Sequence, residues 1–360
     1  MYRYGHGGNA VYENEEKSVL DLSANINPLG MPKGVMDAIE TEATNCDRYP
    51  DSSARELRER IARFENIDPE WIFCGGGASD IIFRLPAAAR AKKVMVTAPA
   101  FSDYERAATV FGAETVRYGL SAAGDFVLDS GFPGAIEAEK PDLVFVCNPN
   151  NPTGKLAEAG LIEEILERCR DAGAYLVCDE CFLDFTEQAE KHTAKAFLEH
   201  YPNLVILKAF TKIFSLPGIR LGYAICRDGA LIDRLYYHGT DWPVSNLAQA
   251  AGAAALEDAE AYIKKTVNYV SKERGVMEKE LARLGYRVFG SAANFVFLRN
   301  PYPFDLGEDL DARGIRIRPC GNFHGLDGSY FRIAVSASEN NVRVLSAISE
   351  ITGAFAEGVG

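Results

Sequence analysis

Short apolar runs alternate with helical patterns through the middle of the chain. Six runs, rich in apolar and β-branched residues, are expected to form strands at 71–74, 94–98, 143–147, 175–179, 204–208 and 221–226. The intervening segments, such as 79–91, 102–111 and 156–172, have helical patterns. Near-continuous apolar strands separated by helices predict an α/β fold with a mostly parallel sheet covered by helices on both faces.

The pattern changes in the last third of the chain. Helices are expected at 246–256 and 259–284, strands at 295–298, 316–318 and 330–335, and a closing helix at 339–355. This arrangement is typical of a smaller α+β unit, which we expect the first forty or so residues to join. The predicted division is a large domain of residues 46–245 and a small domain of residues 1–45 and 246–360.

The charge balance limits the classes of partner. The 360-residue chain carries 51 acidic and 38 basic residues, a net charge of −13, and contains no run of lysine and arginine. Such a surface repels nucleic acid and anionic membranes, although a few buried arginines could still hold a small anionic substrate. No apolar segment is long enough to span a bilayer, and the first residues do not resemble a secretion signal. We therefore expect a cytoplasmic protein that binds neither nucleic acid nor membrane.

The eight cysteines are scattered along the chain. Several lie in apolar runs, where they are expected to be reduced, buried and inert. Cys178 and Cys181 form a C-x-x-C pair, but no second Cys or His pair stands at ligand spacing, so no metal site is expected. A redox pair would normally open a helix, whereas Cys178 falls inside an expected strand, which favours a structural role.

Ligands of open α/β sheets bind beyond the carboxyl ends of the strands, so the residues that follow each strand are informative. The first run is followed by Gly75-Gly76-Gly77-Ala78-Ser79, which opens a helix. Glycines allow close backbone approach, and a helix N-terminus offers free N–H groups to an anion. The dinucleotide fingerprint and the P-loop are both absent, so this turn alone fits a phosphate site or an ordinary loop equally well.

Three further strand ends carry polar motifs. Asn148–Gly154 contains two Asn-Pro steps, Asp179-Glu180 follows the next run, and Lys212 stands in the segment between the last two runs. Each would be unremarkable alone, as a turn, a solvated carboxylate or a surface lysine. All of them lie at the same edge of the predicted sheet, which favours a common site.

Together these motifs resemble the signature of fold type I pyridoxal-phosphate enzymes. The resemblance rests on Asn151-Pro152-Thr153-Gly154, on Asp179-Glu180, and on Thr211-Lys212 followed by Arg220, and it extends over nearly the whole chain. It implies pyridoxal 5'-phosphate as the cofactor, bonded covalently to Lys212. It also implies that Asp179 pairs with the protonated ring nitrogen and that Asn151 donates to the phenolic oxygen of the ring.

The same resemblance assigns the remaining cofactor contacts. Gly77, Ala78 and Ser79 are expected to hold the cofactor phosphate at the helix N-terminus, with Thr211 nearby and Arg220 as the counter-charge. Tyr104, in Phe101-Ser102-Asp103-Tyr104, is the expected ring-stacking residue, with packing in the core as the alternative.

A closer similarity is to the threonine-phosphate decarboxylases of cobalamin synthesis, relatives of the histidinol-phosphate aminotransferases. The segments that carry it are 6–9, 23–30, 48–51, 179–185, 316–323 and 330–334. His6-Gly7-Gly8-Asn9 resembles the decarboxylases more than the aminotransferases. The similarity implies that Arg332 binds the substrate carboxylate and that Arg318 and His6 hold its phosphate, with Asn25 close by. Such anchors select the reaction, because the Cα bond that stands perpendicular to the cofactor ring is the one that breaks.

Some positions depart from the family pattern. Phe182 replaces a tyrosine that often bonds the ring oxygen, and Ala209 replaces a Ser or Thr that often bonds the cofactor phosphate. Thr211 could compensate for Ala209, and Lys208 could add charge nearby or be solvated. The family also implies a homodimer in which Tyr49 crosses the interface to the cofactor phosphate, unless Tyr49 simply packs the turn before Pro50.

The leading hypothesis is decarboxylation of L-threonine O-3-phosphate to (R)-1-amino-2-propanol O-2-phosphate. L-serine O-phosphate, which would give ethanolamine phosphate, remains open as a second substrate because one methyl group is discriminated by only about 1–3 kcal/mol. The alternative is an aminotransferase that acts on histidinol phosphate or a similar phosphorylated amine with 2-oxoglutarate. A cofactor-binding regulator is disfavoured, since the chain has no residues to spare for a DNA-binding module.

Overall fold

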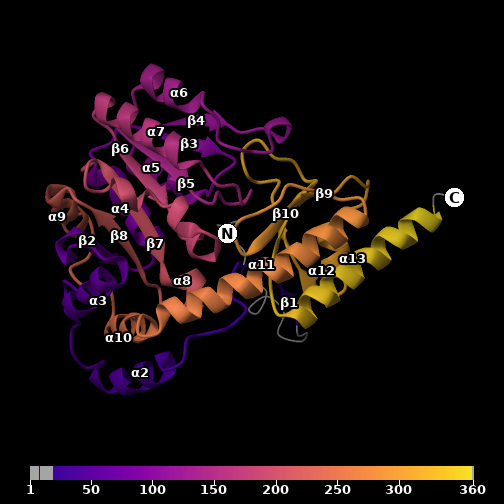
Figure 1. Ribbon diagram of the computed structural model, residues 1–360, viewed down its shortest axis with the longest axis horizontal. Coiled ribbons are helices and arrows are strands. Elements are labelled where there is room, and N and C mark those ends of the chain that lie inside the picture. Colours follow the sequence, from indigo (N-terminus) through magenta and orange to yellow (C-terminus); the bar gives the residue numbers. More distant parts are fainter. Residues whose placement is uncertain (1–7, 9–18, 359–360) are drawn as a thin grey trace.

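Within the part of the chain that the computed structural model describes, residue 8 and residues 19–358, seven strands form the larger sheet (Figure 1). In sheet order they are β2 (Ile72–Gly75), β8 (Gly222–Cys226), β7 (Leu204–Ala209), β6 (Tyr175–Asp179), β5 (Leu143–Cys147), β3 (Lys93–Ala98) and β4 (Glu114–Gly119). Only β8 runs antiparallel to its neighbours in this sheet. The predicted mostly parallel sheet is confirmed, and the carboxyl ends of its other six strands lie at one edge.

Helices cover both faces of this sheet because successive strand residues point to opposite sides. In β3, Val94 and Val96 pack into one apolar cluster, and Met95 packs into the other. The first cluster includes residues of α4 (Ala78–Ala88), α5 (Asp103–Val110) and α9 (Gly229–Tyr237), and the second includes residues of α3 (Arg55–Glu65), α6 (Phe132–Glu139) and α7 (Ala159–Ala172). Strands that are apolar on both faces thus produce the two-sided cover that their sequence predicts.

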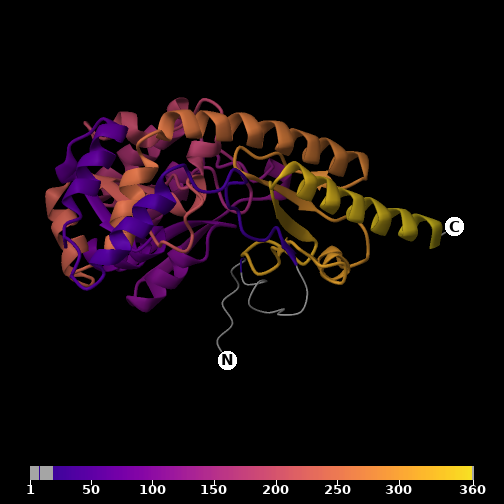
Figure 2. The ribbon, with the colours of Figure 1, turned by 90° about the horizontal axis from the view of Figure 1, so that it is seen from below.

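A second unit contains a four-stranded antiparallel sheet of order β12 (Arg318–Pro319), β13 (Tyr330–Ala334), β10 (Phe295–Arg299) and β9 (Arg287–Val288). The helices α11 (Ala259–Arg283), α12 (Leu306–Asp311) and α13 (Ser338–Gly358) accompany it. Seen from below, α11 runs along the molecule from the larger unit to the smaller one (Figure 2). The start of the described chain joins this unit, since β1 (Leu20–Asp21) pairs in parallel with β11 (Ile315–Arg316).

Three helices from separate parts of the sequence pack together at one end of the larger sheet: α2 (Val35–Glu42), α3 and α10 (Asn246–Ala255) (Figure 1). The contact between α10 and α3 is close at Gly252, where a Cβ atom would lie 3.0 Å from a methyl group of Leu57. Helices α2 and α10 therefore flank the larger unit. The division at residues 45 and 245 stays a prediction.

The structure contains elements that the sequence pattern did not reveal. Strand β4 is an edge strand with mostly polar or partly exposed side chains, so it lacks the apolar run that marked the central strands. The strand expected at 316–318 divides into β11 and β12, which belong to different sheets.

All eight cysteines are free thiols, and all but Cys46 are buried. No helix in the described ranges combines the length and the apolar character needed to cross a bilayer.

Candidate active site

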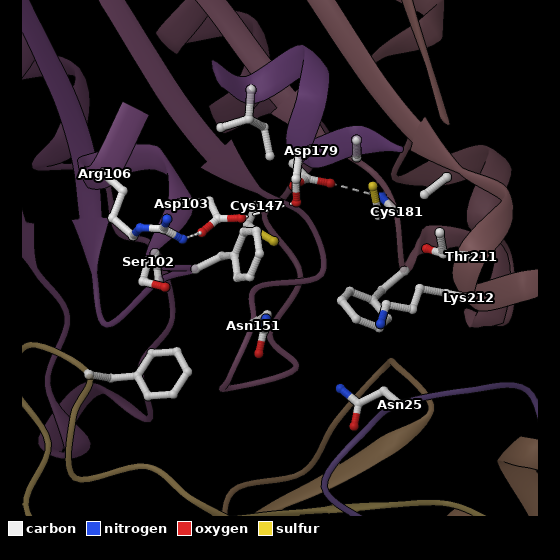
Figure 3. A pocket seen from close by; sticks show the side chains of 18 of the residues that line it. Asn25, Ser102, Asp103, Arg106, Cys147, Asn151, Asp179, Cys181, Thr211 and Lys212 are labelled. Carbon is white, nitrogen blue, oxygen red and sulfur yellow. Dashed lines mark hydrogen bonds and ion pairs between the residues drawn. The ribbon is translucent and has the colours of Figure 1, made fainter. Parts of the chain in front are cut away.

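A cavity of about 720 Å³ lies at the carboxyl edge of the larger sheet and is also lined by the smaller unit (Figure 3). Most of the residues predicted to form the site line it: Asn25, Ala78, Ser79, Asn151, Asp179, Thr211, Lys212, Arg220, Arg318 and Arg332. They come from segments as distant in sequence as residues 25 and 332. The fold therefore brings the predicted strand-end motifs into one site.

One end of the cavity has the form of an anion cradle. Gly77 has φ +89°, and a Cβ atom at this position would lie 2.7 Å from Nη2 of Arg220. Gly222 is equally restricted, because its Cβ would lie 2.6 Å from the backbone nitrogen of Ala78. The glycines let the guanidinium approach the first turn of α4, where backbone N–H groups are free of intrahelical partners. A guanidinium beside a helix N-terminus suits a phosphate group.

Ser79 lies in the same first turn. Its hydroxyl donates to Oδ2 of Asp103 at 3.0 Å, and Asp103 also pairs with Arg106 at 2.7 Å. The side chain of Ser79 is thus anchored to the start of α5.

Lys212 lies in α8 (Phe210–Ile213), directly after β7, and its amine lies 6.0 Å from the ring centroid of Phe182. Burial lowers its pKa from 10.5 to about 8, and the positive charges of Arg332 and Arg220 contribute in the same direction. A much larger fraction of this amine is therefore neutral near physiological pH than for a solvated lysine. A neutral amine is the nucleophilic form that bonds covalently to an aldehyde.

Asp179 ends β6 and is buried, with 5% of its surface exposed. Its Oδ2 accepts a hydrogen bond from the hydroxyl of Tyr104 at 2.6 Å, and its Oδ1 accepts one from the backbone N–H of Cys181 at 3.1 Å. The carboxylate also borders the cavity (Figure 3). A carboxylate fixed in this way can face the protonated ring nitrogen of a pyridine cofactor.

Tyr104 does not stack in the cavity, so its predicted role is corrected. Its ring packs against Phe145 with centroids 4.7 Å apart and an interplanar angle of 12°, and only 1% of its surface is exposed. The aromatic residue of this segment that lines the cavity is Phe101. Tyr104 faces the sheet because it lies in the first turn of α5, on the same face as Ala107 and Ala108. That helical spacing was visible in the sequence and would have separated the two aromatics.

Arg332 extends from β13 and is 6% exposed. Its guanidinium donates to the backbone oxygen of Ser23 at 2.8 Å and to the side-chain oxygen of Asn151. With its amide oxygen toward the guanidinium, Asn25 accepts from Nε and Nη1 of Arg332, each at 3.2 Å. Burial lowers the pKa of Arg332 to about 10, and the nearby charge of Arg318 adds to this effect. The group stays cationic and is oriented by residues of two segments, one with Ser23 and Asn25 and the other with Asn151.

Arg318 supplies a second cation on the wall contributed by the smaller unit. Nη2 of Arg318 donates to the side-chain oxygen of Asn322 at 2.9 Å, and the guanidinium lies 5.2 Å from the ring centroid of Phe323. Burial lowers the pKa of Arg318. Asn322 and Phe323 also line the cavity, although the sequence analysis did not select them.

The charges that border the cavity favour an anionic ligand. Two acidic residues of its lining are engaged in ion pairs, since Asp103 pairs with Arg106, and Glu105 pairs with Arg117 at 2.6 Å. Arg318 and Arg332 also line the cavity, as does Asn25. Two arginines at this position can bind carboxylate or phosphate oxygens bidentately.

The predicted roles of His6 and Tyr49 stay predictions. His6 lies outside the described residues. Tyr49 is 78% exposed, stacks on Trp242 with centroids 4.2 Å apart and does not line the cavity.

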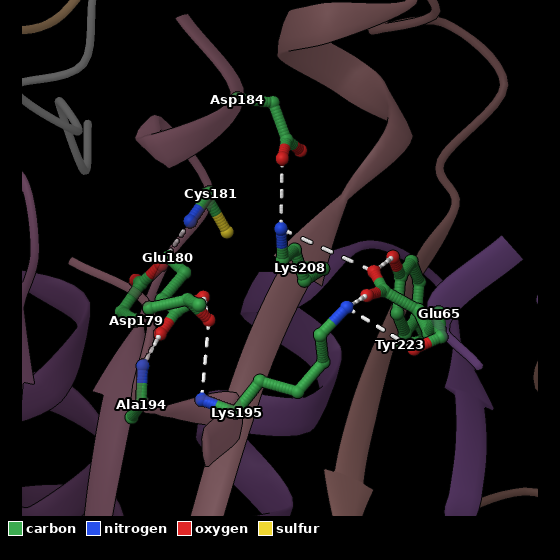
Figure 4. Close-up of polar contacts among 10 residues, drawn as sticks. Glu65, Asp179, Glu180, Cys181, Asp184, Ala194, Lys195, Lys208 and Tyr223 are labelled. Atoms are coloured by element: carbon green, nitrogen blue, oxygen red, sulfur yellow. Dashed lines mark hydrogen bonds and ion pairs between the residues drawn. The ribbon is translucent and has the colours of Figure 1, made fainter. Parts of the chain in front are cut away.

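Lys208 does not add charge to the cavity. Its amine pairs with Asp184 at 2.8 Å and lies 4.0 Å from Glu65, inside a buried network that also includes Lys195 and Tyr223 (Figure 4). Neighbouring strand residues point to opposite faces, so Ala209 lines the cavity while Lys208 points away from it. Lys208 is therefore neither a solvated lysine nor a residue that faces the cofactor site.

The family model "Aminotransferase class I and II" matches residues 17–348. The chain belongs to this family. It is 33% identical to threonine-phosphate decarboxylase of Salmonella typhimurium, over 98% of this chain and 97% of the relative. It is also 31% identical to histidinol-phosphate aminotransferase of Caldanaerobacter subterraneus subsp. tengcongensis, over 92% of each chain.

A solved structure supports the same classification of this aminotransferase-family chain. The histidinol-phosphate aminotransferase of Clostridium acetobutylicum superimposes with a TM-score of 0.85 at 30% identity, over 93% of this chain and 99% of the other. The predicted fold, the type I fold of pyridoxal-phosphate enzymes, is confirmed. The predicted relationship to the threonine-phosphate decarboxylases is confirmed as well.

Proposed function

We propose that this protein is a pyridoxal-phosphate-dependent decarboxylase that converts L-threonine O-3-phosphate to (R)-1-amino-2-propanol O-2-phosphate and carbon dioxide. The observation that carries the proposal is the similarity to the Salmonella decarboxylase, which spans both chains almost completely. The cavity agrees with it, because the walls around Lys212 include two buried or partly buried arginines suited to a doubly anionic substrate.

The cavity residues fit the cofactor of this family. The Gly77–Arg220 cradle would hold the phosphate, Asp179 would face the ring nitrogen, and Lys212 would bond to the aldehyde carbon. When bound, pyridoxal phosphate supplies an electron sink for the carbanion that forms when a Cα bond breaks. Asn151, which accepts from Arg332, is placed to connect the cofactor region with the substrate anchor.

The arginines would determine which bond breaks. Arg332 binds the substrate carboxylate, and Asn25, which accepts from Arg332, lies close by. Arg318 holds the substrate phosphate together with His6, which lies outside the described residues. Two anchors would fix the rotation of the substrate and so favour loss of its carboxylate over loss of the Cα hydrogen. Lys212, with a pKa of about 8, can then deliver a proton to Cα at neutral pH.

Product analysis tests this proposal directly. The purified protein, saturated with pyridoxal phosphate, is incubated separately with L-threonine phosphate, L-serine phosphate and histidinol phosphate, with and without 2-oxoglutarate. We expect carbon dioxide from L-threonine phosphate without any keto acid, and none from the Lys212→Ala variant. Absence of carbon dioxide from both phosphorylated amino acids would contradict the proposal.

The second candidate is an aminotransferase that acts on histidinol phosphate or a similar phosphorylated amine. The similarity to the Caldanaerobacter and Clostridium aminotransferases favours it. Against it stands Phe182, which lines the cavity where many aminotransferases carry a tyrosine that bonds the ring oxygen. Glutamate formed from 2-oxoglutarate, without carbon dioxide from the amine substrate, would select this candidate.

The relative use of threonine and serine phosphate is a finer part of the proposal. One methyl group contributes about 1–3 kcal/mol in an apolar pocket, so we expect kcat/KM to favour threonine phosphate by about tenfold or more. The 30% identity to a bifunctional protein of adenosylcobalamin biosynthesis from Leptospira interrogans, over 96% of this chain and 41% of that protein, supports a place in cobalamin biosynthesis. A cytoplasmic location is a further part of the proposal.

We also propose a homodimer in which Tyr49 reaches the cofactor phosphate of the other copy. The exposed Tyr49–Trp242 stack supports this arrangement, because solvent-exposed aromatic pairs commonly mark interfaces. Mixing Tyr49→Phe with Lys212→Ala protein tests it. Hybrid dimers should contain one site that carries both changes and one site that carries neither, and activity should rise on mixing.

A further inference from the structure

The carboxylate of Asp179 is held by one side chain from outside the cavity wall. The Tyr104 hydroxyl donates to Oδ2 at 2.6 Å, while the backbone N–H of Cys181 occupies Oδ1 at 3.1 Å. Tyr104 is 1% exposed and does not line the cavity. Neither the predicted stacking role nor core packing alone explains why a phenol at this place points its hydroxyl at the carboxylate.

We propose that Tyr104 is a positioning residue that orients and stabilises the ionised Asp179 carboxylate against the ring nitrogen of the cofactor. The inference rests on the proposed cofactor site and adds a residue that acts on the cofactor only through Asp179. It predicts that the hydroxyl of Tyr104 affects cofactor affinity and electronic state without touching the cofactor.

The ring of Tyr104 is fixed well enough to aim its hydroxyl. It stacks on Phe145 at 4.7 Å, and Phe101 packs edge-to-face against it at 5.7 Å and 82°. Offset-stacked and edge-to-face contacts are the favourable geometries for aromatic pairs. The hydroxyl therefore has little freedom to leave the carboxylate.

The hydroxyl also remains a donor at every working pH. Burial raises the pKa of the phenol well above its ordinary value of 10, and the neighbouring charge of Asp179 raises it further. A protonated phenol donating to a carboxylate stabilises the charged form of that carboxylate. An ionised Asp179 is the form that pairs with a protonated ring nitrogen, so loss of the donor should weaken that pair.

The chain offers a matched control. The hydroxyl of Tyr223 donates to Oε1 of Glu65, also at 2.6 Å, and Tyr223 is 4% exposed. This pair belongs to the network around Lys208, and neither residue lines the cavity. Tyr104→Phe and Tyr223→Phe remove the same atom from the same kind of buried pair, and only the first pair includes Asp179.

The experiment compares both variants with the wild type in cofactor-free form. Titration with pyridoxal phosphate, followed by the quenching of protein fluorescence, gives Kd, and the visible spectrum of the loaded protein is recorded across pH. We expect Kd to rise about tenfold in Tyr104→Phe, which corresponds to about 1.4 kcal/mol, and less than twofold in Tyr223→Phe. The pH midpoint of the spectral change should shift in Tyr104→Phe alone, while both variants lose similar thermal stability before loading.

Equal effects of the two variants on Kd and spectrum would overturn the inference, because a merely structural hydroxyl predicts this result. A coupling test adds a second criterion: combined with Asp179→Asn, Tyr104→Phe should raise Kd by less than it does alone. Full additivity would also overturn the inference. If the wild type itself fails to bind pyridoxal phosphate, the proposed function fails first, which separates the two outcomes.

Discussion

Lys208 and Lys212 lie four residues apart, yet their environments affect their charge in opposite ways. Burial alone would lower the pKa of Lys208, but the carboxylates of Asp184, Glu65 and Glu180 raise it above its ordinary value. Burial lowers the pKa of Lys212 to about 8, and the strongest neighbouring cations, Arg332 and Arg220, add to that effect. The opposite pKa shifts of the two lysines come from the neighbouring charges and not from a difference in burial.

The surroundings of the two lysines explain this contrast. Lys208 belongs to a network in which Glu65 also accepts from Lys195 at 3.0 Å and from Tyr223, so positive and negative charges compensate each other (Figure 4). Burial would raise the pKa of Glu65, but the charges of Lys208 and Lys195 keep it below its ordinary value. Lys212 shares its cavity with Arg332 and Arg220, and the positive charge of both favours the neutral amine. The charge-paired cluster around Lys208 stabilises the fold, whereas the cations around Lys212 favour a neutral, nucleophilic amine.

The largest expected effect is on the reaction itself. Lys212→Ala should lower kcat for release of carbon dioxide by about 10³- to 10⁴-fold, because it removes both the covalent attachment and the proton donor. Lys208→Met, measured under the same conditions with its folding verified by circular dichroism, should lower kcat by less than about tenfold. Comparable losses in both variants would show that the division between the two clusters is wrong.

Stability should show the reverse order. Lys208→Met removes the buried cation that pairs with Asp184 and lies near Glu65, although Glu65 keeps its contact with Lys195; this change is expected to cost about 3–5 kcal/mol of unfolding free energy. Urea denaturation of the cofactor-free protein measures this change. The double variant Lys208→Met with Asp184→Leu should lose less than the sum of the single variants, since it removes both charges of one pair. A loss below about 1 kcal/mol in Lys208→Met would mean that water already screens the network.

The core of the candidate site was predictable because parallel strands bring their carboxyl ends together. Strands β5 and β6 pair in register with Cys147 opposite Asp179, and this places Asn151 and Asp179 at neighbouring strand ends. Lys212 follows β7, the next strand of the sheet. Long apolar runs identify such strands, and the residues that follow neighbouring strands then lie close together at the edge of the sheet.

The errors arose where the direction of a side chain mattered. Tyr104 and Phe101 are three residues apart, but one lies inside the first turn of α5 and faces the sheet, while the other precedes that helix and faces the cavity. Lys208 was ambiguous for the same reason, because a polar residue in an apolar strand can point to solvent or into a buried network. Lys208 points into the buried network because it contacts the carboxylates of Glu65, from α3, and Asp184, from the segment after β6. No local sequence pattern around Lys208 reveals these distant partners.

The arginine wall should give the next largest effect. Arg332→Gln is expected to lower kcat/KM for L-threonine phosphate by about 100-fold, mostly through KM, because a bidentate cation for the substrate is lost. Arg299→Gln is the control, since Arg299 lies on the adjacent strand β10 but is exposed and does not line the cavity. Steady-state kinetics with both variants checks this. A loss of less than about threefold in Arg332→Gln would remove Arg332 from substrate binding.

The smallest effect concerns the pH dependence of stability. Because the folded pKa of Lys212 is about 8 and its ordinary value is 10.5, the unfolded chain binds more protons between these values. The unfolding free energy therefore rises as pH increases from about 8 to 10.5, because the charged amine of Lys212 loses its proton. Below pH 8 the buried charge of Lys212 destabilises the folded protein to its full extent. Since water in the cavity screens part of the charge, we expect Lys212→Met to stabilise the cofactor-free protein by about 1–2 kcal/mol near pH 7.

Urea denaturation of the cofactor-free wild type and Lys212→Met proteins at about pH 7 and about pH 10 measures this difference. Subtracting the unfolding free energy of the wild type from that of the variant at each pH cancels the contribution of the tyrosines and cysteines that titrate in both. The advantage of Lys212→Met should be largest at pH 7 and should shrink as pH rises. Lys208→Met should show no such advantage at either pH, because its lysine is stabilised in the charged form by the surrounding carboxylates. An advantage of Lys212→Met that is constant with pH would mean that the added methionine packs better, and that the charge of Lys212 costs the fold nothing.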